Sequence, residues 1–164
     1  MTRTRDYAGL AVFIAINVAV SALGGWATAA SVGTWYQALA KPAFNPPNWI
    51  FAPVWSALYL MIAIAGWRVW RRGAGEAGGA GRESRLALTV YAVQLVLNLS
   101  WSFVFFGARL IGPALAVIAA LLAAILVNVT LFWRIDRTAG ALLVPCAAWV
   151  SFAALLNAAL WRLN

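Results

Sequence analysis

Five long apolar stretches constrain the fold of this chain more than any other feature of its sequence. Each contains about 20 predominantly apolar residues, which is the length that an α-helix needs to cross the hydrocarbon core of a bilayer. With ends defined to within about two to four residues, the sequence predicts spans at residues 7–29, 49–70, 85–106, 111–133 and 138–161. We therefore expect an all-α integral membrane bundle of five transmembrane helices, forming a single domain over residues 1–164.

The composition supports a membrane protein and excludes several chemistries. Hydrophobic residues make up 65% of the chain and charged residues 10%, whereas a typical soluble domain has roughly 25% charged residues. With no His and one Cys, a Cys/His zinc site, a disulfide scaffold and a histidine base are excluded. The four acidic residues lie outside the predicted spans, which argues against ion-coupled transport. Stable axial haem ligation is not expected either, so we predict no metal and no cofactor.

The distribution of basic residues predicts the orientation of the chain. The net charge of +8 does not indicate a nucleic-acid partner, because the basic residues flank apolar runs and form no stripe interleaved with aromatics. Nine of the 12 basic residues flank the spans on the side of the N-terminus, and three lie on the other side. Since cytoplasmic flanks are enriched in Lys and Arg, we expect a cytoplasmic N-terminus and an external C-terminus.

The ends of the spans and the segments between them contain motifs that predict local structure. Asn45-Pro46-Pro47 predicts an N-cap followed by proline in the first turn of the second span. The glycines between residues 73 and 81 predict a flexible linker. The first span also resembles a secretory signal that ends at Ala27-Thr28-Ala29. Its apolar run is longer than a usual signal core, so we expect it to be retained as a span.

The ten tryptophans exceed what an aromatic belt at the membrane surface requires. Most lie at span ends, but Trp55, Trp101 and Trp149 lie well inside predicted spans, where an indole N–H needs a partner or a polar cavity. In the third span, polar and aromatic residues recur every three or four positions and share one helix face, at Tyr91, Gln94, Asn98, Trp101 and Phe105. Amides on that face must point into the bundle. They serve either as interhelical hydrogen bonds or as the polar wall of a ligand cavity, and the pattern favours neither.

The first loop, residues 30–48, is too aromatic and too rich in proline for an idle linker. A long structured loop is usually functional. With a rise of 1.5 Å per residue, Trp55, Asn98, Trp101 and Trp149 lie roughly 8 to 18 Å from the outer ends of their spans, the side from which this loop emerges. The loop therefore fits a lid over an outward-facing apolar pocket. The alternative is that it merely docks on the end of the bundle.

Several segments together form a familiar set. They are Trp35-Tyr36-Gln37-Ala38-Leu39-Ala40-Lys41-Pro42, Phe44-Asn45-Pro46-Pro47-Asn48-Trp49, Pro53-Val54-Trp55-Ser56-Ala57-Leu58-Tyr59, Gln94, Asn98, Trp101, Phe105-Phe106-Gly107, Leu143-Val144-Pro145, Trp149, Asn157 and Trp161-Arg162. This set resembles the signature of the translocator protein family, the tryptophan-rich sensory proteins (TspO, or peripheral-type benzodiazepine receptor). The resemblance covers nearly the whole chain, with five spans in the family order.

The resemblance implies a bacterial five-helix membrane protein, often a homodimer, that binds porphyrins in a pocket closed by the first loop. It also implies a role in sensing oxygen, light or stress. By position, Trp55 and Trp149 match tryptophans linked to light-dependent porphyrin breakdown, which would make them catalytic if that activity occurs. With the patterns above, the predicted ligand-binding residues are Trp35, Tyr36, Pro42, Asn45, Trp55, Tyr59, Tyr91, Gln94, Asn98, Trp101, Pro145 and Trp149.

These observations leave three functions open: a receptor or carrier for tetrapyrroles, an enzyme that degrades porphyrin in light, and a ligand-independent membrane scaffold. Small residues recur every four positions at Ala11, Ala15 and Ala19 and again at Ala116, Ala120 and Ala124, which suits helix packing either within the chain or between two copies. The family occurs in outer membranes, whereas the charge bias suits an inner membrane, so both placements stand. Because alanine replaces the tyrosine of the animal sterol motif at residues 157–162, we assign no cholesterol binding.

Overall fold

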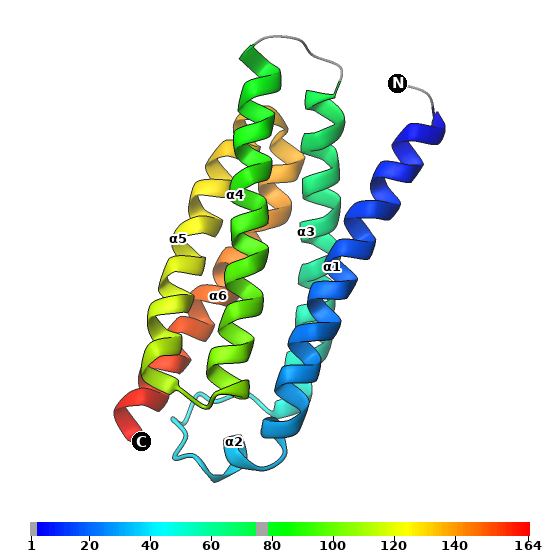
Figure 1. The fold of residues 1–164 in the computed structure, drawn as a ribbon. Helices are drawn as coiled ribbons and strands as arrows, with labels where there is room; N and C mark the ends of the chain where they lie inside the picture. Colours follow the sequence, from blue (N-terminus) through cyan, green and yellow to red (C-terminus); the bar gives the residue numbers. More distant parts are fainter. Residues whose placement is uncertain (1–2, 75–78) are drawn as a thin grey trace.

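The computed structural model describes residues 3–74 and 79–164 and is built from five long helices, as Figure 1 shows. In length and hydropathy all five are able to cross a membrane, over Arg3–Val32, Asn48–Gly73, Gly81–Gly107, Ile111–Ile135 and Arg137–Leu163. The prediction of an all-α chain with five membrane-spanning segments is confirmed. In chain order the elements are α1 (Arg3–Val32), α2 (Trp35–Ala38), the 3-10 turn η1 (Asn48–Ile50), α3 (Phe51–Gly73), α4 (Gly79–Ser102), the π-helical turn η2 (Phe103–Gly107), α5 (Ile111–Ile135) and α6 (Arg137–Leu163).

The helices pack around an apolar core to which α3, α4, α5 and α6 contribute most. Helix α6 lies against α5 and α3, and α4 lies against α5 and α3. Helix α1 packs on α3, α4 and η2 from the outside, and of its 30 residues the buried ones are Asn17, Gly24, Ala27 and Ser31. The short α2 lies in the first loop, at the end of the bundle that also carries the C-terminus (Figure 1). The exposed tryptophans at span ends, Trp26, Trp49, Trp133 and Trp161, suit an aromatic belt.

Two predictions about the breaks between spans were wrong in detail. Asn45 does not cap the second span, because the helical turns begin at Asn48 and no side chain caps them. The two ends of the glycine-rich segment that was predicted to be a linker are helical, since α3 continues to Gly73 and α4 begins at Gly79. Ala74 lies in a turn after α3, and residues 75–78 of that predicted linker lie outside the described residues.

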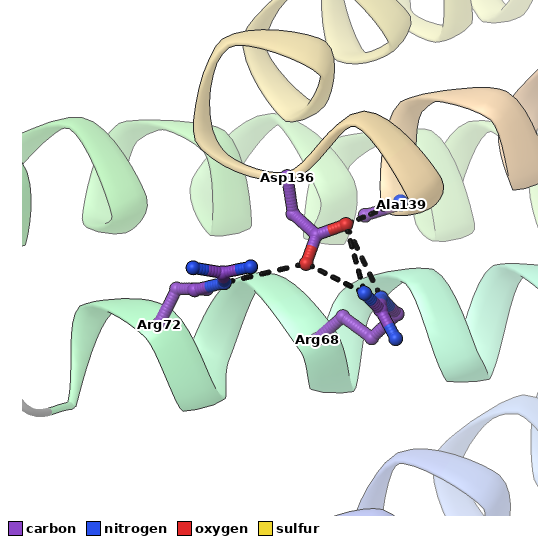
Figure 2. Close-up of polar contacts among 4 residues, drawn as sticks. All are labelled: Arg68, Arg72, Asp136 and Ala139. Carbon is purple, nitrogen blue, oxygen red and sulfur yellow. Dashed lines mark hydrogen bonds and ion pairs between the residues drawn. The ribbon is translucent and has the colours of Figure 1, made fainter.

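A single residue, Asp136, separates α5 from α6 at the end of the bundle opposite the first loop. Its Oδ1 accepts a hydrogen bond from the Ala139 backbone N–H at 3.0 Å and so caps α6. As Figure 2 shows, Arg68 donates to both carboxylate oxygens, with Nη2 to Oδ2 at 2.9 Å, and Arg72 Nε lies 3.4 Å from Oδ2. The carboxylate therefore connects the start of α6 to the last turns of α3.

Candidate ligand-binding site

A cavity of about 310 Å³ lies between α1, α3 and α4, close to the end of the bundle that carries the first loop. Most of its wall is apolar, with a few hydroxyl and amide groups, as is usual for small-molecule sites. It is lined by Ser21, Gly24, Gly25, Thr28, Ala29, Val32, Asn48, Phe51, Ala52, Trp55, Ser56, Tyr59, Asn98, Trp101, Ser102 and Phe106. Five of these side chains are aromatic, so the cavity suits a flat apolar ligand.

The aromatic wall is built from α3 and α4. The ring centroids of Trp55 and Trp101 lie 6.5 Å apart, and those of Trp55 and Tyr59 lie 5.8 Å apart. Trp101 also stacks on Phe105, with centroids 5.4 Å apart and planes inclined by 28°. Its indole Nε1 donates to Asn157 Oδ1 on α6 at 3.1 Å. Because the indole is held at both its face and its N–H, Trp101 presents a fixed surface to the cavity.

Asn98 places an unused hydrogen-bond donor in the cavity wall. The residue is 1% exposed, and its Oδ1 accepts a hydrogen bond from the Tyr59 hydroxyl at 3.1 Å. Within the described part of the chain, its Nδ2 has no partner. A buried polar group without a partner costs about 1 to 3 kcal/mol. A ligand that brings a carboxylate or carbonyl oxygen to Asn98 would remove that cost.

The first loop covers this end of the cavity through Tyr36, which is 2% exposed. The Tyr36 ring packs against Phe106 at 5.7 Å and Phe51 at 6.5 Å, and both of these residues line the cavity. Its hydroxyl donates to Asn45 Oδ1 at 2.7 Å, and the Lys41 ammonium lies 5.3 Å from its ring centroid. Burial raises the pKa of Tyr36 to about 12, so at neutral pH the hydroxyl stays protonated and remains a donor.

The structure brings some of the predicted site residues together and separates others. Trp55, Tyr59, Asn98 and Trp101 line the cavity, and Tyr36 and Asn45 lie in the loop above it. Tyr36 and Asn45 are not among the described residues that line the cavity, and neither are the six remaining predicted residues, namely Trp35, Pro42, Tyr91, Gln94, Pro145 and Trp149.

Two of these six make interhelical hydrogen bonds instead. Gln94 Oε1 accepts from Asn128 Nδ2 of α5 at 3.1 Å, and the Tyr91 hydroxyl accepts from Asn17 Nδ2 of α1. The polar face of α4 therefore serves both purposes that the sequence left open. Near the loop it faces the cavity at Asn98, and deeper in the bundle it holds neighbouring helices.

Trp149 lies next to the cavity wall rather than in it. Its ring packs against Phe51 at 6.1 Å and Phe152 at 5.5 Å, and Phe51 lines the cavity. Its Nε1 is buried and has no partner among the described residues. Rotation of Phe51 would bring Trp149 into contact with a ligand.

The sequence reasoning missed the contribution of α1 to the site. Ser21, Gly24, Gly25 and Thr28 line the cavity and follow the spacing of one helix face. This run of small and hydroxyl-bearing residues was a usable signal. At Gly24 an added Cβ would lie 3.3 Å from Ser102 Oγ, so the small residue allows α1 to approach α4 closely.

Comparisons with known proteins bear on this arrangement. A model of the TspO/MBR family matches residues 13–162. The chain is 35% identical over 158 residues to protein CrtK of Rhodobacter capsulatus, covering 94% of each chain. It is 36% identical over 159 residues to the tryptophan-rich protein TspO of Chlorobaculum tepidum, covering 94% of this chain and 95% of the relative. It is also 36% identical over 149 residues to the translocator protein of Sus scrofa, covering 88% of this chain and 86% of the relative.

Proposed function

Because this chain belongs to the TspO/MBR family, we propose that it is a membrane receptor or carrier for porphyrins and similar flat apolar ligands. The ligand lies in the cavity between α1, α3 and α4, beside the Trp55 and Trp101 indoles. The first loop acts as the lid. One observation carries the proposal: a buried amide donor, Asn98 Nδ2, has no partner among residues 3–74 and 79–164 and belongs to an aromatic-walled cavity at the end of the bundle that carries the first loop.

The cavity is small for a porphyrin, so binding is expected to require part of the protein to move. Its volume of about 310 Å³ is at the lower end of the roughly 300 to 1,000 Å³ typical of small-molecule sites. A tetrapyrrole therefore requires the lid or α1 to shift. Helix α1 packs on the outside of the bundle and buries few of its side chains, so its displacement disrupts little of the core. Such a shift would change the conformation of the protein when the ligand binds. This change gives the proposed sensing role a physical basis.

Titration of protoporphyrin against the protein in lipid nanodiscs, in the dark, tests the proposal through the Soret absorbance. Asn98→Leu removes the free donor and is expected to weaken binding about five-fold, the value of one neutral hydrogen bond. Trp55→Leu removes part of the aromatic wall and is also expected to weaken binding. The matched control is Trp161→Leu, since Trp161 is 57% exposed. Unchanged affinity in both cavity variants would contradict the proposal.

Trp149→Leu separates this cavity from a larger site that includes α6. If the ligand occupies the cavity as shaped here, Trp149→Leu changes the affinity much less than Trp55→Leu does, because Phe51 lies against Trp149 and lines the cavity. An equal loss in the two variants would instead indicate that Phe51 moves when the ligand binds.

A second candidate function in the same cavity is light-driven breakdown of the porphyrin, with dioxygen as the oxidant. It is favoured by the position of Trp55, an oxidisable indole in the cavity wall. The pigment itself would carry the chemistry. Loss of Soret absorbance in light but not in darkness, reduced in Trp55→Leu, would support this activity. Equal loss with empty nanodiscs would exclude it.

A further inference from the structure

A second cavity of about 310 Å³ lies between α1 and α3, closer to the middle of these helices than the first. Its lining residues are Ile14, Asn17, Val18, Ser21, Ala22, Ser56, Tyr59, Leu60 and Ala63. Three of them, Ser21, Ser56 and Tyr59, also line the first cavity, so the two spaces are neighbours. Val18 is 60% exposed and Leu60 is 51% exposed, so the second cavity opens toward the lipid-facing side of the bundle.

Asn17 contributes a hydrogen-bond acceptor to this otherwise mostly apolar cavity. The residue is 1% exposed and lies near the middle of α1. Its Nδ2 donates to the Phe13 carbonyl at 2.9 Å and to the Tyr91 hydroxyl. Because a carbonyl oxygen only accepts hydrogen bonds, these contacts determine which end of the amide is nitrogen. Its other end, Oδ1, is a buried acceptor that has no partner in the described ranges 3–74 and 79–164.

Three hydroxyl-bearing residues line this cavity, and among the described residues none of them donates to Asn17 Oδ1. Ser21 does not reach this oxygen, and the other two hydroxyls donate elsewhere. The Tyr59 hydroxyl donates to Asn98 Oδ1 at 3.1 Å, and Ser56 Oγ donates to the Ala52 carbonyl at 2.8 Å. Both residues line the second cavity, yet their hydrogens are directed to other acceptors. A buried acceptor in the hydrocarbon region is stabilised only when a donor reaches it. The donor that fits is one carried by a molecule from the bilayer.

We propose that the cavity between α1 and α3 is a second binding site, for a small apolar molecule that enters from the bilayer and donates one hydroxyl hydrogen to Asn17 Oδ1. The inference goes beyond the proposed porphyrin function, because it concerns a neighbouring cavity whose unpaired polar atom is an acceptor rather than a donor. The first cavity offers a donor, Asn98 Nδ2, to ligands that carry an acceptor. The second offers an acceptor, so it selects alcohols rather than carboxylates.

The experiment uses two probes with the same ring system, 1-naphthol and its methyl ether 1-methoxynaphthalene, in which a methyl group replaces the hydroxyl hydrogen. Their binding to the protein in nanodiscs is measured by fluorescence and corrected with empty nanodiscs of the same lipid. We expect 1-naphthol to bind about five-fold more tightly than its methyl ether. Asn17→Leu abolishes that preference. Ala22→Phe, at an exposed residue that lines the cavity, blocks both probes and keeps Asn17 intact.

The matched control is Ala19→Phe, which places the same ring on the exposed surface of α1, at a residue that does not line the cavity, and is expected to bind both probes normally. Equal affinity of the two probes for the unmodified protein would overturn the proposal. So would a naphthol preference that survives in Ala22→Phe. Trp55→Leu is expected to keep the preference, since Trp55 lines only the first of these two cavities. Failure of the porphyrin proposal and failure of this one therefore give different results.

Discussion

At the scale of single residues, Asp136, which lies between two of the membrane-spanning segments, connects α6 to α3 through its ion pair with Arg68. Burial of the carboxylate raises the pKa of Asp136, but hydrogen bonds from Arg68 and from the Ala139 N–H, with the charges of Arg68 and Arg72, more than offset it and lower the pKa. The carboxylate is therefore ionised at neutral pH and bonded on both oxygens. This one side chain caps α6 and bonds it to α3.

Replacement of the carboxylate is expected to destabilise the fold. Asp136→Asn retains an oxygen for the cap but loses the charge that faces Arg68, so the free energy of unfolding should fall by about 1.5 to 3 kcal/mol. Unfolding by increasing SDS mole fraction in mixed micelles measures the change. The exposed acidic residue Glu83 provides the control, and Glu83→Gln should unfold like the unmodified protein.

The same pair predicts a dependence of stability on pH. Between the lowered pKa of Asp136 and its ordinary value of 3.8, the unfolded chain binds a proton that the folded protein does not. The stabilisation is therefore present above pH 3.8 and is lost as the pH falls through the lowered pKa. The difference in unfolding free energy between the unmodified protein and Asp136→Asn should shrink over that range. A difference that stays constant with pH would contradict the ion-pair account.

At the scale of structural elements, the first loop is attached to the bundle by hydrogen bonds as well as by aromatic contacts. Tyr36 donates to Asn45 within the loop. The Ala40 backbone exchanges two hydrogen bonds with the Asn164 side chain, each 3.0 Å long. These bonds lie at the rim, whereas the ring of Tyr36 is buried. The loop is therefore held by buried packing and by hydrogen bonds, and the hydrogen bonds can break while the packing is kept.

Tyr36→Phe is expected to loosen the loop while preserving its packing. The change leaves Asn45 Oδ1 without the donor it has in the structure, at a cost of about 1 kcal/mol. Hydrogen exchange of residues 35–48 should accelerate about five-fold, with little change in α5 and α6. Tyr7→Phe is the control, because Tyr7 is 70% exposed. Unaltered exchange in the loop would show that the hydroxyl contributes nothing to its closure.

Close approach of α5 and α6 depends on Gly140. An ideal Cβ built there would lie 2.8 Å from the Trp133 Cα, which is a backbone atom and cannot rotate away. Gly140→Ala should therefore lower the free energy of unfolding by about 1 to 3 kcal/mol in the same SDS titration. Gly25→Ala serves as the control, since nothing lies within 4 Å of its added Cβ. Equal stability of the two variants would mean that the helices separate without cost.

At the scale of the whole molecule, the outer surface of the bundle is apolar and carries both small-residue faces. Ala11, Ala15 and Ala19 on α1 are exposed, and so are Ala116 and Ala120 on α5. These faces therefore contribute little to packing within the chain. They are left to contact lipid or a second copy, so either face could form the homodimer that the family resemblance implies.

A dimer that uses either face should be sensitive to a bulky residue there. Ala15→Trp or Ala120→Trp is expected to reduce the dimer fraction, measured by cross-linking in nanodiscs or by mass photometry. The variant that dissociates the dimer identifies the interface. A dimer that persists in both variants would contradict the use of these faces.

The orientation predicted from the basic residues can be tested by cysteine labelling. Cys146 is buried, so the unmodified chain gives little background. In intact spheroplasts, Phe44→Cys in the first loop should react with a membrane-impermeant maleimide. Arg82→Cys should react only after permeabilisation, because it lies among the basic residues expected to be cytoplasmic. The reverse pattern would contradict the charge-based orientation.

The sequence alone determined the five spans and the inward orientation of the two amides of the third span, Gln94 and Asn98. Length and hydropathy are local properties of the sequence. An apolar stretch that is long enough to cross the bilayer forms a helix, because its backbone groups must form hydrogen bonds with one another there. In addition, amides such as Asn98 and Gln94 cannot face lipid, whatever the neighbouring helix is. The resemblance to a family added porphyrin as the expected ligand and several site residues as expectations.

Only the tertiary structure decided how the inward-facing residues are used. The spacing of α4 places Tyr91, Gln94 and Asn98 on one face, but it does not say which helix lies opposite each of them. Asn128 and Asn17 happen to lie opposite Gln94 and Tyr91, whereas the amide of Asn98 borders open space. Contacts between helices depend on crossing angles and side-chain volumes contributed by distant parts of the chain. For that reason the two cavities and the unpaired Asn17 oxygen could be found only in three dimensions.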